Sequence, residues 1–317
     1  GKSAMDISAA MARYTKACIL IFRRAHWPLP KLLMNGRLSA RSLLSRVFSL
    51  PFDPYPSAPC STEIRCLHRM FPSISIKMMD LMADDVITTH GPDLYGDKIF
   101  LTSTPIRHAG NVFMIPDDFI KLKREGRIIG KLGSIDSIVD KTTIQLTSGE
   151  QLQADMIVCA TGYQLQLPFL PDTIRQVIGL PISTEFSAPT IDPDLELYRR
   201  VVPIGIPNLC FLGFTISLGQ WMITEVSSHW ISEYFLGRLK LPPSEKDMHN
   251  EIQRVRTFAR KNFDRGVCQV NYHWAALIDT LLNDMGLPIH RTNNWITEHF
   301  GIYRPNRLKG LHDERQA

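Results

Sequence analysis

The sequence predicts a mixed α/β protein that contains parallel strands. A glycine at position 1 leads into a helix-like segment that runs to Tyr14, and the apolar run Ala17–Phe22 (ACILIF) follows it. A second apolar run, Met156–Cys159, stops at the tetrapeptide Ala160-Thr161-Gly162-Tyr163. Uninterrupted apolar runs of this length are typical of parallel strands covered on both faces. We therefore expect both runs to be buried strands of an α/β sheet.

Length and composition limit the class of protein. A chain of 317 residues suits two domains of roughly 100–200 residues each. The hydrophobic share of 44% and the charged share of 21% are ordinary for a folded protein and exclude extensive disorder. The net charge of +5 suits an anionic cofactor, but it is too small and too scattered to indicate a nucleic-acid partner.

Metal, disulfide and membrane signals are weak. The six cysteines are widely spaced without a CxxC pair, which predicts free thiols. Cys60, Cys66 and His68 lie close in the sequence but lack a fourth ligand, so we expect no metal site. No secretory signal opens the chain. The uncharged run between Arg200 and Glu225 is interrupted by proline and glycine, which favours buried segments joined by turns over a membrane span.

Periodicity predicts the remaining elements. Helices are expected at about 62–90, at 117–126, at about 220–239 and at about 245–263, where Ser244 and Asp247 form a capping box. Alternating segments predict a β-meander, with its strands at Arg127–Ile129, Ser134–Val139, Thr142–Leu146 and Gln151–Gln153. Residues 208–212 predict an apolar strand before a glycine loop. We expect a first domain at 1–159 with an insertion at about 48–97, and a second domain at 160–317.

The first thirty residues carry a dinucleotide-binding signal. Gly1-Lys2-Ser3-Ala4 fits the second half of the motif GxGxx[GA], in which a glycine turn brings a pyrophosphate to a helix N-terminus. About twenty residues after this motif, an acidic residue selects NAD and an arginine accommodates the 2′-phosphate of NADP. Arg23 and Arg24 stand at that position. The pattern favours NADPH, the alternative being two arginines that merely face solvent at a strand end.

Two further segments are candidate cofactor contacts. Thr161-Gly162-Tyr163 follows the second apolar run, where a small-Thr-Gly break lets the chain turn sharply beside a dinucleotide. Gly219 and Gln220 lie between a glycine loop and a predicted helix, which would place free backbone N–H groups at a helix N-terminus. Each segment is equally compatible with an ordinary turn or a buried strand–loop–helix unit.

Together these segments resemble the flavin-containing monooxygenase superfamily. GKSAMDIS is similar to its NADPH-binding motif, FRRAHWPLP to its NADP-selecting strand end, and ADMIVCATGYQLQLPFLP to its ATGY segment. IPNLCFLGF and GQWMITEVSSHW resemble the C-terminal strand and helix of its flavin domain. The match follows the family's order over nearly the whole chain and weakens after about residue 245.

The resemblance implies a Rossmann-like NADP-binding domain with a helical insertion, truncated at its first strand, and the C-terminal part of a split FAD-binding domain. It implies the cofactors FAD and NADPH, with O₂ and a small molecule as substrates. One oxygen atom would pass from a C4a-(hydro)peroxyflavin to nitrogen or sulfur. The resemblance also implies that an N-terminal FAD-binding segment is missing, so we expect these residues alone to bind flavin poorly and to be inactive.

Three alternatives stay open. A Baeyer–Villiger ketone monooxygenase would need an arginine entering the second part of the NADPH domain, for which Arg107 is a candidate. A pyridine-nucleotide disulfide reductase would need a redox cysteine pair, which this sequence lacks. A truncated, non-catalytic protein that binds NADP(H) at most is the third. Since the C-terminus is polar and charged, we expect a cytoplasmic protein without a membrane span.

Overall fold

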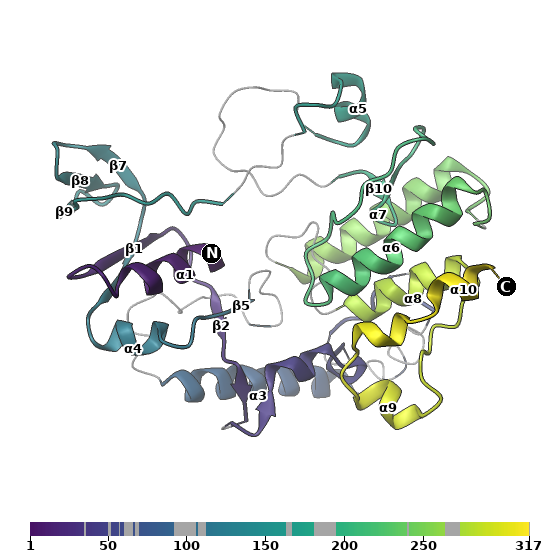
Figure 1. Cartoon of the computed structure of the whole chain (residues 1–317), viewed down its shortest axis with the longest axis horizontal. Helices are drawn as coiled ribbons and strands as arrows, with labels where there is room; N and C mark the ends of the chain where they lie inside the picture. The colour runs from purple at the N-terminus through teal and green to yellow at the C-terminus, as the bar shows by residue number, and fades with distance from the viewer. Residues whose placement is uncertain are drawn as a thin grey trace. The chain divides into compact units, whose positions relative to one another are not determined.

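The computed structural model has a mixed α/β fold (Figure 1). It describes residues 1–34, 36–49, 52–56, 58–59, 66, 70–91, 106, 112–162, 167–180, 195–239, 241–263 and 273–316. The chain forms two compact units. The first contains Gly1–Ala40 and Asp80–Tyr163, and the second contains Arg41–Met79 and Gln164–Ala317. The expected domain boundary at 159/160 and the insertion at about 48–97 stay predictions.

The core of the first unit joins two helices to a pair of parallel strands. Helices α1 (Lys2–Met11) and α4 (Phe119–Arg124) pack against β1 (Cys18–Phe22) and β6 (Ile128–Leu132) (Figure 1). The residues buried between them are Met5, Ala9, Ala12, Leu20, Ile115, Phe119 and Ile128. The predicted first helix and strand are therefore confirmed.

Burial of β1 is less complete than its apolar sequence predicts. Leu20 is its one buried residue, and the other four residues of the strand are half-buried. Among the described residues β1 pairs with β6 alone. A parallel strand is covered on both faces only when its sheet is wide enough to carry helices on each side. The expectation of a fully buried strand was therefore wrong for this pair.

The other strands of the first unit form three small sheets. Strand β2 (Trp27–Leu29) pairs in parallel with β5 (Val112–Met114), and β3 (Leu32–Leu33) pairs with β4 (Leu38–Ser39) in a hairpin. The third sheet is antiparallel, with the order β7 (Ile135–Ile138), β8 (Thr143–Leu146) and β9 (Gln151–Gln153).

The predicted meander is confirmed for three of its four segments. The segment that begins at Arg127 was expected to belong to the same sheet. It instead forms β6, in parallel register with β1 from Cys18 opposite Ile128 to Phe22 opposite Leu132. Gly133, which has a φ of +154°, follows β6 directly and breaks the chain between the two sheets. Strand partners far apart in sequence decide this assignment, and local alternation does not reveal them.

The apolar run Met156–Cys159 is not a buried strand in the structure. These residues form no strand, and the exposed fractions of Met156, Ile157 and Val158 are 71%, 44% and 49%. A strand needs a hydrogen-bonded neighbour along at least one edge, because its backbone groups cannot bond within the strand itself. Within the described part of the chain, no strand lies beside this run. The predicted strand was therefore wrong for this structure.

Helix α3 (Pro72–His90) confirms the helical prediction for the second half of residues 62–90. The short 3-10 helices η1 (Ala40–Leu44) and η2 (Arg46–Ser49) precede it. The chain passes from the first unit to the second between Ala40 and Arg41, and it returns between Met79 and Asp80.

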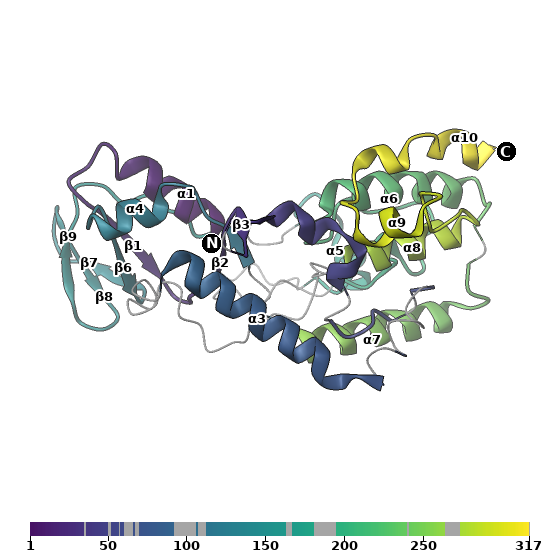
Figure 2. The ribbon, with the colours of Figure 1, turned by 90° about the horizontal axis from the view of Figure 1, so that it is seen from below.

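The second unit is mainly helical. Helices α6 (Gln220–Phe235) and α8 (Trp274–Asp284) lie side by side and form its centre (Figure 2). The unit also contains α5 (Asp172–Val177), α7 (Glu245–Asn262), α9 (Trp295–Phe300), η5 (Pro305–Leu308), α10 (Leu311–Gln316), and the hairpin of β10 (Leu197–Tyr198) and β11 (Val202–Pro203). Fully buried apolar side chains of α6 and α8 are Val226, Trp230, Ile278, Leu281 and Leu282.

Local signals explain where these helices start and stop. Helix α7 begins as predicted, since the Ser244 hydroxyl accepts a hydrogen bond from the Asp247 N–H. Helix α6 starts at Gln220 as predicted but ends at Phe235, four residues before the expected Leu239. Gly237, with a φ of +68°, follows it, and its N–H bonds to the Tyr234 carbonyl. A left-handed glycine of this kind commonly terminates a helix.

The predicted strand at residues 208–212 is not formed. One backbone hydrogen bond joins this segment to the hairpin region, from the Phe211 N–H to the Val201 carbonyl at 2.8 Å. Phe211 is nevertheless buried in a small apolar cluster with Leu195 and Leu197. The prediction of a buried segment was therefore right only for Phe211, since Asn208 and Leu212 are exposed. The predicted strand was wrong because one bond does not make a ladder.

Candidate functional site

The first candidate cofactor-binding group is the N-terminus of α1. Gly1 is its N-cap residue, and no side chain caps the helix by a hydrogen bond. The first turn carries no acidic side chain, and Lys2 forms an ion pair with Asp6. Ser3 is exposed, while Ala4 packs against the core. Because backbone N–H groups at a helix start carry partial positive charge, this end of α1 suits an anion.

Arg23 and Arg24 follow β1 at the same end of the first unit. The far end of α1 lies where β1 and β6 begin, since the Arg127 guanidinium donates to the Thr15 carbonyl at 2.7 Å and the Cys18 N–H donates to the Arg127 carbonyl at 2.8 Å. The start of α1 therefore lies toward the C-terminal ends of β1 and β6. The two exposed arginines directly follow the C-terminal end of β1. The structure thus places Gly1–Ala4 and Arg23–Arg24 at one edge of the unit.

The segment Thr161-Gly162 forms a sharp, exposed break in the chain. Both residues are exposed, and Gly162 has a φ of +89°, a conformation that favours glycine. No other heavy atom comes within 4 Å of the position where a Cβ on Gly162 would lie. Tyr163, the third candidate residue of this segment, lies outside the described residues.

Gly219 lies in the second unit, where it packs closely against Trp274. A Cβ at this position would lie 3.0 Å from Cβ and 3.1 Å from Cγ of Trp274. Any other residue would need Trp274 to shift by a few tenths of an ångström, so glycine favours this close approach of α6 to α8. The N–H of Gly219 donates to the Ser217 hydroxyl at 3.1 Å. The loop therefore supplies its own acceptor for this N–H, and the assignment of Gly219 as a cofactor contact stays a prediction.

Gln220 holds the glycine loop in place. Its Oε1 accepts a hydrogen bond from the Thr215 hydroxyl at 2.9 Å, and its Nε2 lies 3.3 Å from the Thr224 hydroxyl and 3.4 Å from the Gly213 carbonyl. Gly213 has a φ of +84°, and no other atom would contact a Cβ there. The loop therefore leaves open space beside Gly213.

Three apolar side chains in this loop or next to it in the sequence are exposed. Leu212 is 47% exposed, Ile216 is 45% exposed and Trp221 is 86% exposed. Large apolar side chains that gather at the surface often mark a binding surface. This group, Leu212, Ile216 and Trp221, is called the α6 loop surface below.

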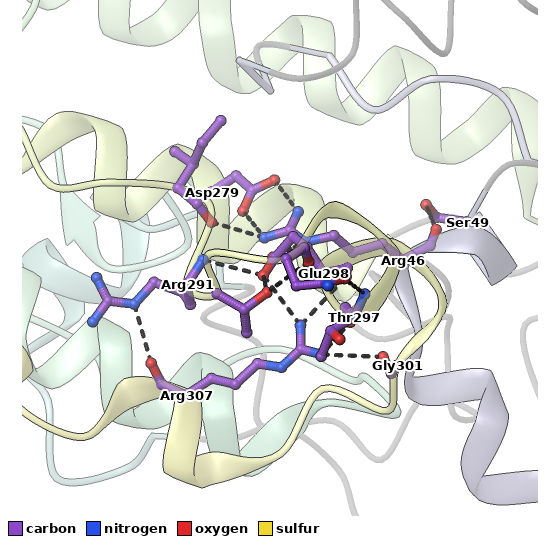
Figure 3. Close-up of polar contacts among 11 residues, drawn as sticks. Arg46, Ser49, Asp279, Arg291, Thr297, Glu298, Gly301 and Arg307 are labelled. Atoms are coloured by element: carbon purple, nitrogen blue, oxygen red, sulfur yellow. Dashed lines mark hydrogen bonds and ion pairs between the residues drawn. The ribbon is translucent and has the colours of Figure 1, made fainter.

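Sequence reasoning missed a buried ion cluster in the second unit (Figure 3). The guanidinium of Arg46 binds the carboxylates of Asp279 and Glu298, and Arg307 also lies at Glu298. All four side chains are at most 9% exposed. In the sequence Arg46 belongs to an ordinary basic, Leu-rich stretch, and no local pattern links it to its partners. The one available signal was that Arg46 stands among apolar residues, which is compatible with a buried side chain.

Other candidate chemistry is sparse in the described residues. No group of three or more His, Cys, Asp or Glu side chains there is arranged to hold a metal ion. Cys18, Cys66, Cys159 and Cys210 are not in disulfides, and burial raises the pKa of the Cys210 thiol to about 11. No helix in the described part is long and apolar enough to cross a membrane. Cys60, Cys268, His68 and Arg107 lie outside the described residues.

The chain is thus a mixed α/β protein. The start of α1 and the two arginines after β1 form an edge that suits a phosphate-bearing ligand. The family model of flavin-binding monooxygenase-like proteins matches residues 107–290. This match covers more than half of the chain. The chain therefore belongs to the flavin-binding monooxygenase-like family.

Individual relatives agree with this assignment. A FAD-dependent monooxygenase of Aspergillus nomiae is 26% identical over 216 residues, which cover 55% of this chain and 37% of the relative. A probable flavin-containing monooxygenase of Arabidopsis thaliana is 24% identical over 309 residues, covering 95% of this chain and 56% of the relative. A mouse flavin-containing monooxygenase is 25% identical over 266 residues, covering 83% and 43%. The chain thus spans about half the length of these relatives or less.

Proposed function

We propose that this chain carries the NADPH-binding part and a portion of the flavin-binding part of a FAD- and NADPH-dependent monooxygenase. The family match over residues 107–290 carries the proposal, and the FAD-dependent monooxygenases among its relatives support FAD as the flavin. The enzyme would transfer one oxygen atom from O₂ to a small-molecule nucleophile, with nitrogen or sulfur favoured over a ketone. The meander sequence at residues 133–158 (GSIDSIVDKTTIQLTSGEQLQADMIV) looks closer to the amine- and sulfide-oxidising branch of the family than to the Baeyer–Villiger branch, which supports this preference.

The residues at the α1 edge fit a dinucleotide phosphate. The helix start offers backbone N–H donors without an acidic side chain in its first turn, and two exposed guanidinium groups follow β1. We assign the pyrophosphate to the start of α1 at Gly1–Ala4 and the 2′-phosphate of NADPH to Arg23 and Arg24. A guanidinium can bind phosphate oxygens through two parallel N–H bonds, which favours a 2′-phosphate over a 2′-hydroxyl.

The α6 loop surface fits one face of a flat aromatic ring. Gly213 leaves space that a Cβ would fill, and Leu212, Ile216 and Trp221 present apolar surface around it. We propose that this surface lies against the flavin, while Gln220 keeps the loop in shape through its bonds to Thr215 and Gly213. A bound flavin would supply the oxygen-activating chemistry. The protein's part is to orient the ring and keep water from it.

The cofactor preference tests the assignment at the α1 edge. In the full chain, the double substitution Arg23→Ala with Arg24→Ala is expected to weaken NADPH binding by roughly 10- to 100-fold, because charge-assisted bonds to the 2′-phosphate are lost. NADH binding should change little, since NADH carries a hydroxyl there. Isothermal titration calorimetry with both cofactors measures the difference.

Arg13→Ala is the matched control for this experiment. Arg13 is also largely exposed and lies in the first unit, but it follows the far end of α1 and pairs with Asp118. It should leave the affinity for NADPH unchanged. An equal loss for NADPH and NADH in the double variant, or an equal loss in Arg13→Ala, would contradict the arginine assignment.

A further inference from the structure

The described residues between positions 41 and 59 belong to the second unit, although Ala40, directly before them, belongs to the first. Polar contacts hold them there, among them those of the Arg46 side chain in η2 and of the backbone carbonyls of Leu44 and Asp53. None of these contacts belongs to the proposed cofactor site.

The Arg46 guanidinium is nearly saturated with acceptors (Figure 3). Its two terminal nitrogens donate to the two oxygens of Asp279 at 2.6 and 2.7 Å. Its Nε donates to Glu298 at 2.7 Å, and one terminal nitrogen also donates to the Ile289 carbonyl at 2.9 Å. The side chain is 9% exposed, and Asp279 is fully buried. Each buried charge therefore has a partner, which is the condition for tolerating it in a protein interior.

Glu298 connects this arginine to the C-terminal residues. Its second oxygen accepts from the Thr292 hydroxyl at 2.9 Å, the Arg291 N–H at 3.2 Å and Arg307 at 3.4 Å. The Tyr303 ring has the guanidinium of Arg46 at 5.6 Å and that of Arg307 at 4.8 Å from its centre. The cluster thus gathers residues from η2, α8, α9 and η5.

The surroundings of Glu298 and Arg46 favour the charged form of both side chains. Burial works against the charged form of Glu298, but the positive charge of Arg46 and the bonds from Thr292 and Arg46 outweigh it and lower the pKa of that carboxyl. Burial likewise opposes the charged form of Arg46, yet the neighbouring Asp279 carboxylate raises the pKa of the guanidinium further. Glu298 and Arg46 are therefore both charged at neutral pH.

Backbone and aromatic contacts reinforce the same attachment. The Tyr303 N–H donates to the Leu44 carbonyl at 2.6 Å, two residues before Arg46. The His273 Nε2 lies 2.7 Å from the Asp53 carbonyl; since a carbonyl only accepts, Nε2 must carry the proton. The His273 ring is surrounded by aromatic side chains, which are Phe52, Tyr55, Phe258 and Phe263.

We propose that Arg46 is an ionic latch that attaches the segment at residues 41–59 to the C-terminal residues of α8, α9 and η5. The segment also contributes Tyr55 and Ala58 to the apolar core around α6 and α8. Opening of the latch would therefore release η1 and η2 locally, next to the point where the chain enters the second unit at Ala40–Arg41, while the apolar core holds the rest of the segment. The latch is a conformational device in addition to the proposed oxygenase function, and it stands independently of it.

Hydrogen exchange of the full chain tests the latch. Arg46→Met should lower the protection of the Tyr303 amide, which bonds to Leu44, by about 100-fold, because the buried carboxylates of Asp279 and Glu298 both lose their bonds to the guanidinium. The amides of Ile223 and Val226 in α6 should keep their protection. Arg46→Lys should retain part of the protection, since it keeps the charge but not the two-pronged geometry.

Two further variants keep the result interpretable. Arg254→Met removes an arginine that is 58% exposed on α7 and should change neither set of amides. Glu298→Gln keeps the Arg46–Asp279 pair and should reproduce the local loss to a smaller extent, even if Arg46→Met does not fold. Equal loss across the Tyr303, Ile223 and Val226 amides in these variants would show a general core role and overturn the latch. Unchanged protection at Tyr303 would overturn it as well.

Discussion

The two units of this protein bury their apolar residues by different means. In the second unit, Trp230, Ile278 and Leu281 are fully buried between α6 and α8. In the first unit, the apolar run at Met156–Cys159 remains exposed, and β1 is buried only at Leu20. Both units are rich in apolar sequence. They differ in whether the backbone of that sequence can complete its own hydrogen bonds.

A helix satisfies its backbone within one segment, whereas a strand depends on its neighbours. The helices of the second unit can therefore form and pack as soon as apolar faces meet. The strands of the first unit are buried only as far as partner strands extend the sheet. Among the described residues, β1 has the single partner β6 and the run at residues 156–159 has none. Apolar sequence thus predicts burial more reliably for the helical unit than for the sheet unit.

The largest expected effect lies in the helical unit. Trp230→Ala should lower the free energy of unfolding by about 3–5 kcal/mol, because it leaves a large cavity. It also removes the indole N–H that donates to Asp284 at 3.0 Å. The control Trp221→Ala, on the same helix but 86% exposed, should stay within about 0.5 kcal/mol of the wild type. Denaturant unfolding measures both, and similar losses would contradict the burial assigned to α6.

A matched pair of isoleucines tests the sheet unit. Ile128→Ala in β6, where the side chain is 1% exposed, should cost about 2–5 kcal/mol. Ile157→Ala, where the side chain is 44% exposed, should cost less than about 1 kcal/mol. The same denaturation experiment compares them. A loss at Ile157 as large as the loss at Ile128 would restore the buried strand that the sequence predicts.

The smallest expected effect is on how the free energy of unfolding depends on pH in the acid range. The pKa of Glu298 is lowered in the folded state, so the unfolded chain takes up its proton first. The stability that Glu298 contributes is present above its ordinary pKa of about 4.5 and is lost as the pH falls through the lowered value. Glu298→Gln should therefore flatten the fall in the free energy of unfolding below about pH 4.5. Stability measured between pH 3 and 7 would show a change in slope of up to roughly 1.4 kcal/mol per pH unit.

An exposed carboxylate of the first unit is the counterpart in this measurement. The pKa of Asp140 is also lowered, by bonds from the Thr142 and Thr143 N–H groups, but its side chain lies in solvent. Asp140→Asn should leave the acid slope nearly unchanged, since solvent screens the contribution of an exposed carboxylate. A larger change at Asp140 than at Glu298 would mean that the buried cluster is not the main acid-sensitive contact of the two.

The candidate site residues likewise differ in how far local sequence predicts them. The helix start at Gly1–Ala4 and the strand end at Arg23–Arg24 follow from local sequence, and the structure places them at one edge. The role of Gly219 did not follow from local sequence. A glycine directly before a helix is equally compatible with a ligand-binding turn and with a close packing contact. The position of Trp274 in the structure shows that Gly219 makes a close packing contact.

Local sequence alone determined the elements whose signals lie within a few residues. Helix α1, strand β1, the capping box of α7 and the start of α6 were predicted correctly. The order of the motifs also pointed to the monooxygenase family that the comparison confirms. These features depend on propensity, capping and short-range periodicity, which neighbouring residues decide.

The tertiary structure alone decided which distant segments meet. It paired β6 with β1 rather than with the meander, and among the residues that the structure describes it gave residues 156–159 no strand partner. It also brought Arg46 to Asp279 and Glu298, which are 233 and 252 residues away in the sequence. Strand pairing and buried ion pairs are decided by contacts between such segments, and no local pattern encodes them.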